Sequence, residues 1–192
     1  MSLKNFARDW KHRSIKLFNR CFRHWNYVMK YDPAAARRDL PSGVEILRFD
    51  NADAIPTELR DKMRRVDSER SVQAYVYHVR NKGAVLWVAM RDGEVIGTQL
   101  SRQGRHIPHW FIPLEADDMV LYRVKTAPAA RGQGLCPSMM QHIIAHELPN
   151  SQSAYADCRI YNHPSIRSLN KTGFRIIGKM RPITEPDRAT QP

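Results

Sequence analysis

Residues 119–148, MVLYRVKTAPAARGQGLCPSMMQHIIAHEL, decide how this chain folds. The stretch begins as an apolar strand over 119–124 and ends as an amphipathic helix that runs to Leu148. Between them, Gly132 and Gly134 stand one residue apart, which allows consecutive backbone N–H groups to point into one concavity. A helix that begins directly after such a turn adds the positive end of its dipole. The stretch therefore predicts a strand, an anion-binding turn and a helix.

Two common nucleotide-binding motifs do not fit this turn. A Walker loop needs Lys and then Ser or Thr after the second glycine, where this chain has Leu135 and Cys136. A dinucleotide fingerprint needs a third glycine, where this chain has Pro137. The pattern that remains is R-x-x-G-x-small over 131–136, with Pro128 placed before it at the end of the strand.

A second segment, YADCRIYNHPSIRSLNKTGF over 155–174, supplies a matching motif. It reads as a strand, Asn162, a short helix with Ser165 near its start, and a Lys-x-Gly-Phe sequence that opens the last strand. Together the two motifs resemble the acetyl-coenzyme A signature of the Gcn5-related N-acetyltransferases, the GNAT superfamily. The resemblance covers residues 44–181 and implies an α+β fold, in which helices flank a mixed, largely antiparallel central sheet.

Composition indicates one globular domain. The chain has 192 residues, of which 42% are hydrophobic and 26% are charged, enough for a single core. No apolar run approaches the roughly 20 residues that a membrane span needs, and the N-terminus lacks a signal-peptide core, so we expect a cytoplasmic protein. The three cysteines show no metal-binding or CxxC spacing, so we expect reduced thiols and no metal site.

Positive charge is concentrated at the front of the chain. The formal net charge is +12, and residues 1–40 contribute +7 of it. Residues 3–29 place apolar and aromatic side chains at near-helical spacing between basic ones, which predicts one or two amphipathic helices. Residues 1–29 would suit an anionic surface at the inner face of the membrane, or equally would pack on their own domain or on a partner subunit in a homodimer. Nucleic-acid binding is the weakest interpretation, because no groove-reading motif accompanies the charge.

The remaining pattern predicts the order of the elements. Residues 74–79 fit either a helix or a short strand, and the connection 102–118 is long and rich in aromatic and titratable groups, which is typical of a specificity loop. We predict a helical extension and linker over 1–40, a GNAT-like domain over 41–181 and a disordered tail over 182–192. Within the domain the expected elements are a strand at 44–49, a helix inside 50–69, strands at 84–90 and 94–101 joined by an Asp92-Gly93 turn, the strand and helix of 119–148, a strand ending at 160, a short helix, and a strand at 174–180.

The resemblance also implies which residues hold acetyl-CoA, the cosubstrate. The splayed end of the strand would present backbone groups to the thioester, one of them stabilising the developing oxyanion. N–H groups of the turn would bind the pyrophosphate, and Asn162 would bind the pantetheine arm or simply cap its helix. Cys136 replaces the usual Gly or Ala, and a reactive thiol there is a less favoured alternative. The full set is Val124, Lys125, Thr126, Arg131, Gly132, Gln133, Gly134, Leu135, Cys136, Asn162 and Ser165.

One position departs from the family pattern. Leu169 stands where family members often carry the Tyr that protonates the departing thiolate. The thiolate can leave unaided, since a reference thiol has a pKa of about 8.5, or Tyr122, Tyr155 or Tyr161 can replace that Tyr. Candidate general bases lie in or next to the 102–118 connection: His109 and Asp118, with His106, Glu115 and Asp117 beside them.

These observations lead to two functional expectations. The resemblance implies an N-acetyltransferase that moves an acetyl group from acetyl-CoA to a primary amine by direct attack in a ternary complex. The basic charge favours a small anionic acceptor, such as an amino-sugar or a nucleotide-sugar. The alternative, motivated by Leu169 and the basic front segment, is a non-catalytic CoA-binding or membrane-tethered regulatory module of the same fold.

Overall fold

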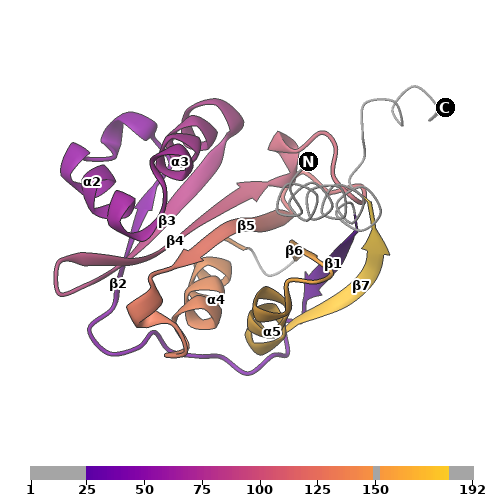
Figure 1. The fold of residues 1–192 in the computed structure, drawn as a ribbon. Coiled ribbons are helices and arrows are strands. Elements are labelled where there is room, and N and C mark those ends of the chain that lie inside the picture. Colours follow the sequence, from indigo (N-terminus) through magenta and orange to yellow (C-terminus); the bar gives the residue numbers. More distant parts are fainter. Residues whose placement is uncertain (1–24, 149–151, 182–192) are drawn as a thin grey trace, which may run out of the picture.

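The computed structural model describes residues 25–148 and 152–181. Its strands are β1 (Asn26–Tyr31), β2 (Glu45–Phe49), β3 (Ala84–Arg91), β4 (Glu94–Gln103), β5 (Met119–Thr126), β6 (Ala154–Arg159) and β7 (Phe174–Met180), and its helices are α2 (Thr57–Val66), α3 (Glu69–Lys82), α4 (Leu135–Glu147) and α5 (His163–Thr172). The strands form one seven-stranded sheet in the order β2-β3-β4-β5-β6-β1-β7. Only β5 and β6 pair in parallel, so the expected mixed, largely antiparallel sheet is confirmed. Figure 1 shows this arrangement.

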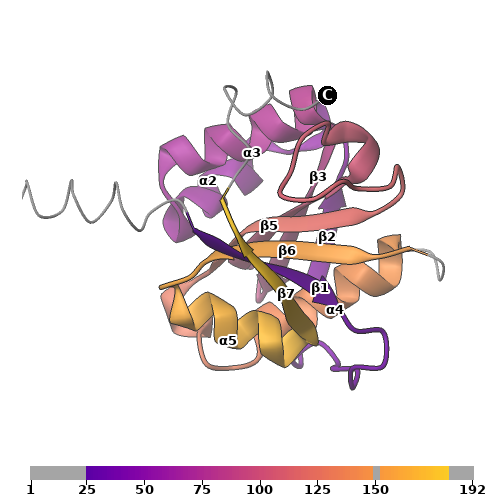
Figure 2. The ribbon, with the colours of Figure 1, turned by 90° about the vertical axis from the view of Figure 1, so that its right-hand side faces the viewer.

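Helices cover both faces of the sheet. Figure 2 shows α2 and α3 on one side of the strands and α4 and α5 on the other. Because successive strand residues point to opposite faces, Leu86 and Val88 belong to the core under α2 and α3. Trp87 and Ala89, between and after them, belong to the core under α4. The alternation of buried residues thus builds two cores on a shared sheet.

Local sequence explains where several helices begin and end. The side chain of Ser68 accepts a hydrogen bond from the N–H of Ser71 and caps α3, which stops at Gly83 in the left-handed conformation. In the same way, Asn162 caps α5 by accepting from the N–H of Ser165, and α5 stops at Gly173. Residues 74–79, which fitted a helix or a strand, lie inside α3.

Strand β1 corrects the prediction that residues 3–29 are helical and that residues 1–40 lie outside the domain. Residues 26–31 are inserted between β6 and β7 and pair antiparallel with both. Val28 and Met29 are 0% exposed. The apolar spacing of so short a segment fits a helix as well as a strand. The strand forms because the edges of β6 and β7 supply hydrogen-bond partners for its backbone.

Two predictions concern the ends of the chain. Residues 1–24 and 182–192 lie outside the described residues, and the predictions of amphipathic helices and of a disordered tail fall there. Among the helices that the structure describes, none is both long and apolar enough to span a bilayer.

Candidate functional site

The site lies where β5 and β6 part. The two strands pair only from Met119 with Ala154 to Leu121 with Ala156. Just beyond, Arg123 adopts φ +52°, and the register with β4 shifts between Thr98 and Leu100. This bulge bends β5 away from β6. A cleft of about 1100 Å³ opens there, lined by both strands, by the glycine turn after β5 and by α5.

The glycine turn offers free backbone donors to this cleft. Gly132 and Gly134 have φ of +78° and +79°, which a residue with a side chain adopts only with strain. Carbonyl groups of the turn are held by side chains: Ala129 accepts from Gln133, and Gly134 accepts from Ser138. The N–H groups of residues 132–136 have no acceptor among the residues described. They therefore remain available to an anion at the start of α4.

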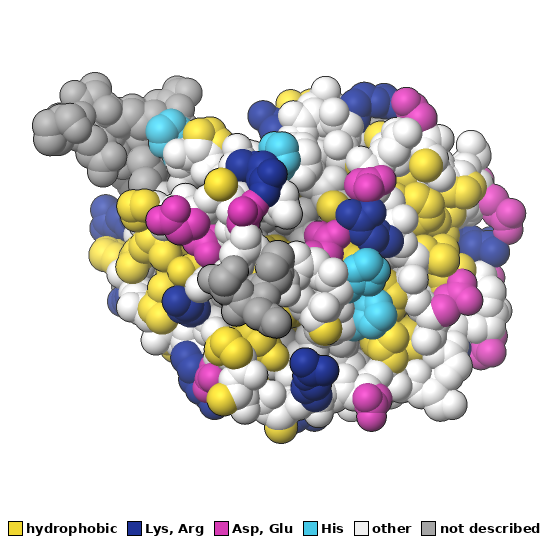
Figure 3. Space-filling view, turned by 180° about the vertical axis from the view of Figure 1, so that it is seen from behind, with side chains coloured by type: hydrophobic (Ala, Val, Ile, Leu, Met, Phe, Trp, Pro, Cys, Tyr) yellow, Lys and Arg dark blue, Asp and Glu magenta, His cyan; other side chains and the backbone are white. Residues whose placement is uncertain are grey.

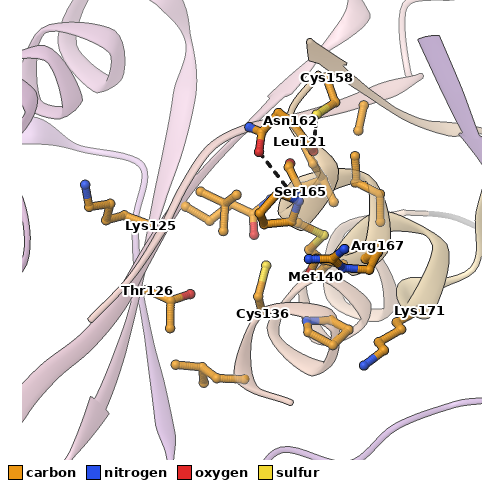
Figure 4. A pocket seen from close by; sticks show the side chains of 18 of the residues that line it. Leu121, Lys125, Thr126, Cys136, Met140, Cys158, Asn162, Ser165, Arg167 and Lys171 are labelled. Carbon is orange, nitrogen blue, oxygen red and sulfur yellow. Dashed lines mark hydrogen bonds between the residues drawn. The ribbon is translucent and has the colours of Figure 1, made fainter. Parts of the chain in front are cut away.

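Three cations of the turn and of α5 line the cleft. Arg131 belongs to the turn that carries the free N–H groups, and Arg167 and Lys171 belong to α5. Figure 4 shows Arg167 and Lys171 at the α5 side, while Cys136 projects from the start of α4 into the space between. Three cations beside free N–H groups suit a ligand with several phosphate charges.

Gln99 of β4 also lines the cleft, and nothing in the local sequence marked it. Its side chain is 0% exposed, yet its Oε1 and Nε2 have no hydrogen-bond partner among the described residues. It lies opposite the bulge, between Thr98 and Leu100. Gln99 pairs with Trp87 across the strands, and Trp87 packs under α4, so Gln99 faces the α4 side. A buried amide without a partner is costly, and a ligand in the cleft would satisfy it.

The residues predicted to hold acetyl-CoA gather at this cleft. Figure 4 shows Thr126 pointing toward the cavity and Lys125 pointing away from it, and the Lys125 ammonium lies 3.4 Å from Asp67. Gln133 is not among the lining residues, and its side chain instead bonds Arg91 and the carbonyl of Ala129. All the other predicted residues line the cleft: Val124, Lys125, Thr126, Arg131, Gly132, Gly134, Leu135, Cys136, Asn162 and Ser165.

The Cys136 environment argues against the reactive-thiol alternative. Burial raises the pKa of Cys136, although a hydrogen bond to Ser168 works in the other direction. A raised pKa keeps the sulfur as the neutral thiol, which is not the nucleophilic form. Cys136 is therefore better described as a small side chain that fits the turn.

The four predicted catalytic candidates do not lie together. Tyr122 lines the cleft, and its hydroxyl is 3.0 Å from Nδ1 of His78. Burial raises the pKa of Tyr122 to about 12 and, with Arg123 and Arg102, lowers that of His78. The carboxylate of Asp118 instead accepts from the N–H groups of Glu115 and Ser153, a structural role. His109 and Tyr161 are not among the residues that line the cleft.

Two charged residues of β6 were not predicted from the sequence as site residues. Asp157 and Arg159 both line the cleft. The sequence pattern could have indicated them, because they alternate with the apolar residues Ala156 and Cys158. A strand beside a parallel neighbour is expected to be buried on both faces, so charged residues in it are unusual. Asn26 of β1, which also lines the cleft, could not be found while its segment was interpreted as a helix.

Fold and cleft together define an α+β domain that can hold a long anionic ligand where its sheet splays. Residues 48–174 match the acetyltransferase (GNAT) family, which is well over half of the chain. The chain belongs to this family, as the two motifs indicated. A search of curated proteins finds no match.

Solved structures show the same fold. A GNAT-family acetyltransferase from Colwellia psychrerythraea is 12% identical with a TM-score of 0.59, over 83% of this chain and 56% of that one. AAC(6')-Iy, in complex with the bisubstrate analogue CoA-S-monomethyl-acetylneamine, is 15% identical with a TM-score of 0.57, over 75% of this chain and 99% of that one. A GNAT-family protein from Novosphingobium aromaticivorans is 18% identical with a TM-score of 0.55, over 82% of this chain and 61% of that one. The chain thus spans less than two thirds of two of these proteins, and at such identities the likeness concerns the fold.

Proposed function

We propose that this protein transfers an acetyl group from acetyl-CoA to the primary amine of a small anionic acceptor, with an amino-sugar or a nucleotide-sugar as the favoured class. The observation that carries the proposal is the set of N–H groups over residues 132–136 that have no acceptor among the described residues, in a turn that lines the cleft at the start of α4. Family membership supports acetyl-CoA as the donor. In the part of the chain that the structure describes, no cluster of metal-ligating side chains is present.

Different residues of the cleft would bind different parts of acetyl-CoA. The N–H groups of the turn, with Arg131, would hold the pyrophosphate, because charge-assisted hydrogen bonds to phosphate are strong. The amide of Gln99 would bond the pantetheine arm or the thioester, since it is buried without a partner among the described residues. The bulge at Arg123 frees backbone groups of β5 beyond Tyr122, where a donor can face the carbonyl oxygen.

Bound acetyl-CoA would supply an acetyl thioester. The amine nitrogen attacks its carbonyl carbon, a C–N bond forms, the C–S bond breaks, and the proton that the amine loses balances the one that the thiolate takes up. Leu169 is 2% exposed in the core and cannot donate that proton. Tyr122, a neutral phenol at the cleft, is the candidate donor that remains there.

The alternative is a non-catalytic CoA-binding module, which Leu169 favours. Release of free thiol from acetyl-CoA, measured with a dye against a panel of amines, separates the two. We expect amine-dependent thiol release with an acetylated product of matching amount. Saturable acetyl-CoA binding without thiol release from any amine would support the module and contradict the enzyme.

Membrane attachment concerns a shorter segment than the sequence suggested. Because Val28 and Met29 are buried inside the sheet, the front segment can contact a membrane only through residues before β1, which lie outside the described part. We expect full-length protein to sediment with anionic liposomes more than protein lacking residues 1–24. Equal sedimentation would refute attachment through this segment. Cytoplasmic location and a homodimer stay predictions.

A further inference from the structure

Asp157 and Arg159 project from the face of the sheet opposite to α4 and α5. Ala154, Ala156 and Cys158 of β6 belong to the core under α4, so the residues between them point the other way. Tyr155 confirms this, because its ring packs 5.7 Å from that of Trp110. Trp110 is also close enough to Asp157 to lower the pKa of that carboxyl group. The cleft passes between the parted strands, so these groups line it from the side away from the glycine turn.

The carboxyl group of Asp157 is held in place by a neutral donor. It follows Ala156, the last β6 residue that pairs with β5. Asn26 donates through Nδ2 to Oδ2 of Asp157 at 2.5 Å. Burial raises the pKa of Asp157, while Asn26, the charge of Arg159 and Trp110 oppose that shift. A carboxylate has about four acceptor positions, so the hydrogen bond from Asn26 leaves capacity for further donors.

Arg159 lies two residues further along the same face, about 6.6 Å away along the strand. It is close enough for its charge to favour ionised Asp157. No ion pair within 4.0 Å joins the two side chains, and Nη1 of Arg159 is buried without a hydrogen-bond partner among residues 25–148 and 152–181. Oδ1 of Asn26 is likewise buried and unpartnered there. A buried polar group that forms no hydrogen bond destabilises the fold.

We propose that Asp157, Arg159 and Asn26 form the acceptor subsite, and that the acceptor is a small molecule carrying both an amine and its own anionic group. The inference rests on the proposed acetyl transfer. The ammonium of the acceptor binds Asp157 and Oδ1 of Asn26, and its phosphate or carboxylate binds the free guanidinium N–H of Arg159. The acceptor enters from the α2 and α3 side of the sheet, while acetyl-CoA lies on the α4 side, so both fit at once.

The separation of the two charges is what makes a doubly charged acceptor fit. A pair of buried charges that contacted each other would be satisfied and would have no reason to bind a ligand. Here the carboxylate and guanidinium face the same cleft without pairing. A purely cationic acceptor would satisfy Asp157 and leave Arg159 unpaired, next to a like charge.

Matched acceptors test the inference. Glucosamine 6-phosphate is compared with glucosamine, and phosphoethanolamine with ethanolamine, because each pair shares one amine and differs in the phosphate. We expect kcat/KM to be about tenfold or more higher for the phosphorylated member, mainly through KM, as one charge-assisted contact would give. R159Q should bring the ratio close to one. The control R175Q removes an equal charge from an exposed position on β7, and should keep the preference.

Asp157→Asn tests the other charged residue of the subsite. It removes the charge and keeps the shape, so we expect KM to rise for both members of each pair. Calorimetric binding of acetyl-CoA shows that each variant is folded. Equal kcat/KM within both pairs, or an R159Q ratio unchanged from the original protein, overturns the inference while acetyl transfer stands. Thiol release from none of these four amines and from no amine of the wider panel overturns acetyl transfer itself, and the inference with it.

Discussion

Gln99 shows at the level of one side chain why a buried polar group points to a ligand. Apolar or hydrogen-bonded residues surround most of the sheet, yet this amide is 0% exposed with both of its polar atoms unpartnered in the described structure. Burial of an amide without partners costs about 1–3 kcal/mol. Selection for stability alone would favour an apolar residue here.

Gln99→Leu separates the ligand-binding role from a structural one. Removing an unsatisfied buried group while keeping most of its volume should leave the melting temperature unchanged or raise it. The KM for acetyl-CoA should rise about tenfold, because one contact is lost. Thermal unfolding and thiol-release kinetics measure the two effects. A lower melting temperature with an unchanged KM would show that Gln99 is structural.

The raised pKa of Tyr122 has a consequence for stability at high pH. An unfolded Tyr ionises near pH 10, whereas Tyr122 in the fold does so near 12. The folded state therefore binds more protons between these values, and stability that is fully present below about pH 10 is lost as the pH rises toward 12. Y122F lacks this contribution and should lose less stability over the same interval in urea unfolding. Parallel losses in the two proteins would contradict the assignment.

At the scale of one element, the proposed anion binding depends on the backbone conformation of the glycine turn. Gly134 has φ +79°, and an added Cβ would meet nothing within 4 Å. Gly93, in the turn between β3 and β4, has φ +75° and equally open space, but it does not line the cleft. The two positions form a matched pair for substitution.

Gly134→Ala and Gly93→Ala should each lower the free energy of unfolding by about 1 kcal/mol, the cost of a left-handed residue with a side chain. Only Gly134→Ala should weaken acetyl-CoA binding, because it shifts the N–H groups that face the phosphates. Urea unfolding and calorimetry give the two quantities. Equal acetyl-CoA affinities in both variants would remove the turn from the binding site.

Strand β1 should behave as part of the core and not as an appendage. Met29 is 0% exposed between β6 and β7, so Met29→Ala should cost about 2–5 kcal/mol. Ile177 on the neighbouring β7 is 46% exposed, and Ile177→Ala should cost distinctly less. Chemical denaturation of both variants tests the difference. A cost for Met29→Ala within about 0.5 kcal/mol would place β1 outside the cooperative unit.

Features set by neighbouring residues could be predicted from the sequence, and features set by distant contacts could not. The turn over 131–136, the cap at Asn162 and the Asp92-Gly93 hairpin are set by neighbouring residues, and each was predicted as it occurs. Strand β1 depends on partners more than a hundred residues away. Likewise Gln99 and Asp157 have their special character only because a bulge in β5 opens the sheet beside them.

For the molecule as a whole, the sheet separates two approaches to one cleft. The glycine turn and α5 lie on one side, and Asp157 with Trp110 lies on the other. The back of the molecule, seen in Figure 3, carries acidic and basic side chains interspersed and not in one field of positive sign. The cations that matter for the proposed function are those at the cleft, which suits two anionic substrates that meet across the sheet.

Calorimetric titration of the full chain with acetyl-CoA tests this account most directly, because acetyl transfer and the acceptor subsite both require the glycine turn to hold the donor. We predict saturable binding with one acetyl-CoA per chain and a dissociation constant well below about 1 mM, a free energy more favourable than about −4 kcal/mol. Absence of binding up to millimolar acetyl-CoA would contradict it.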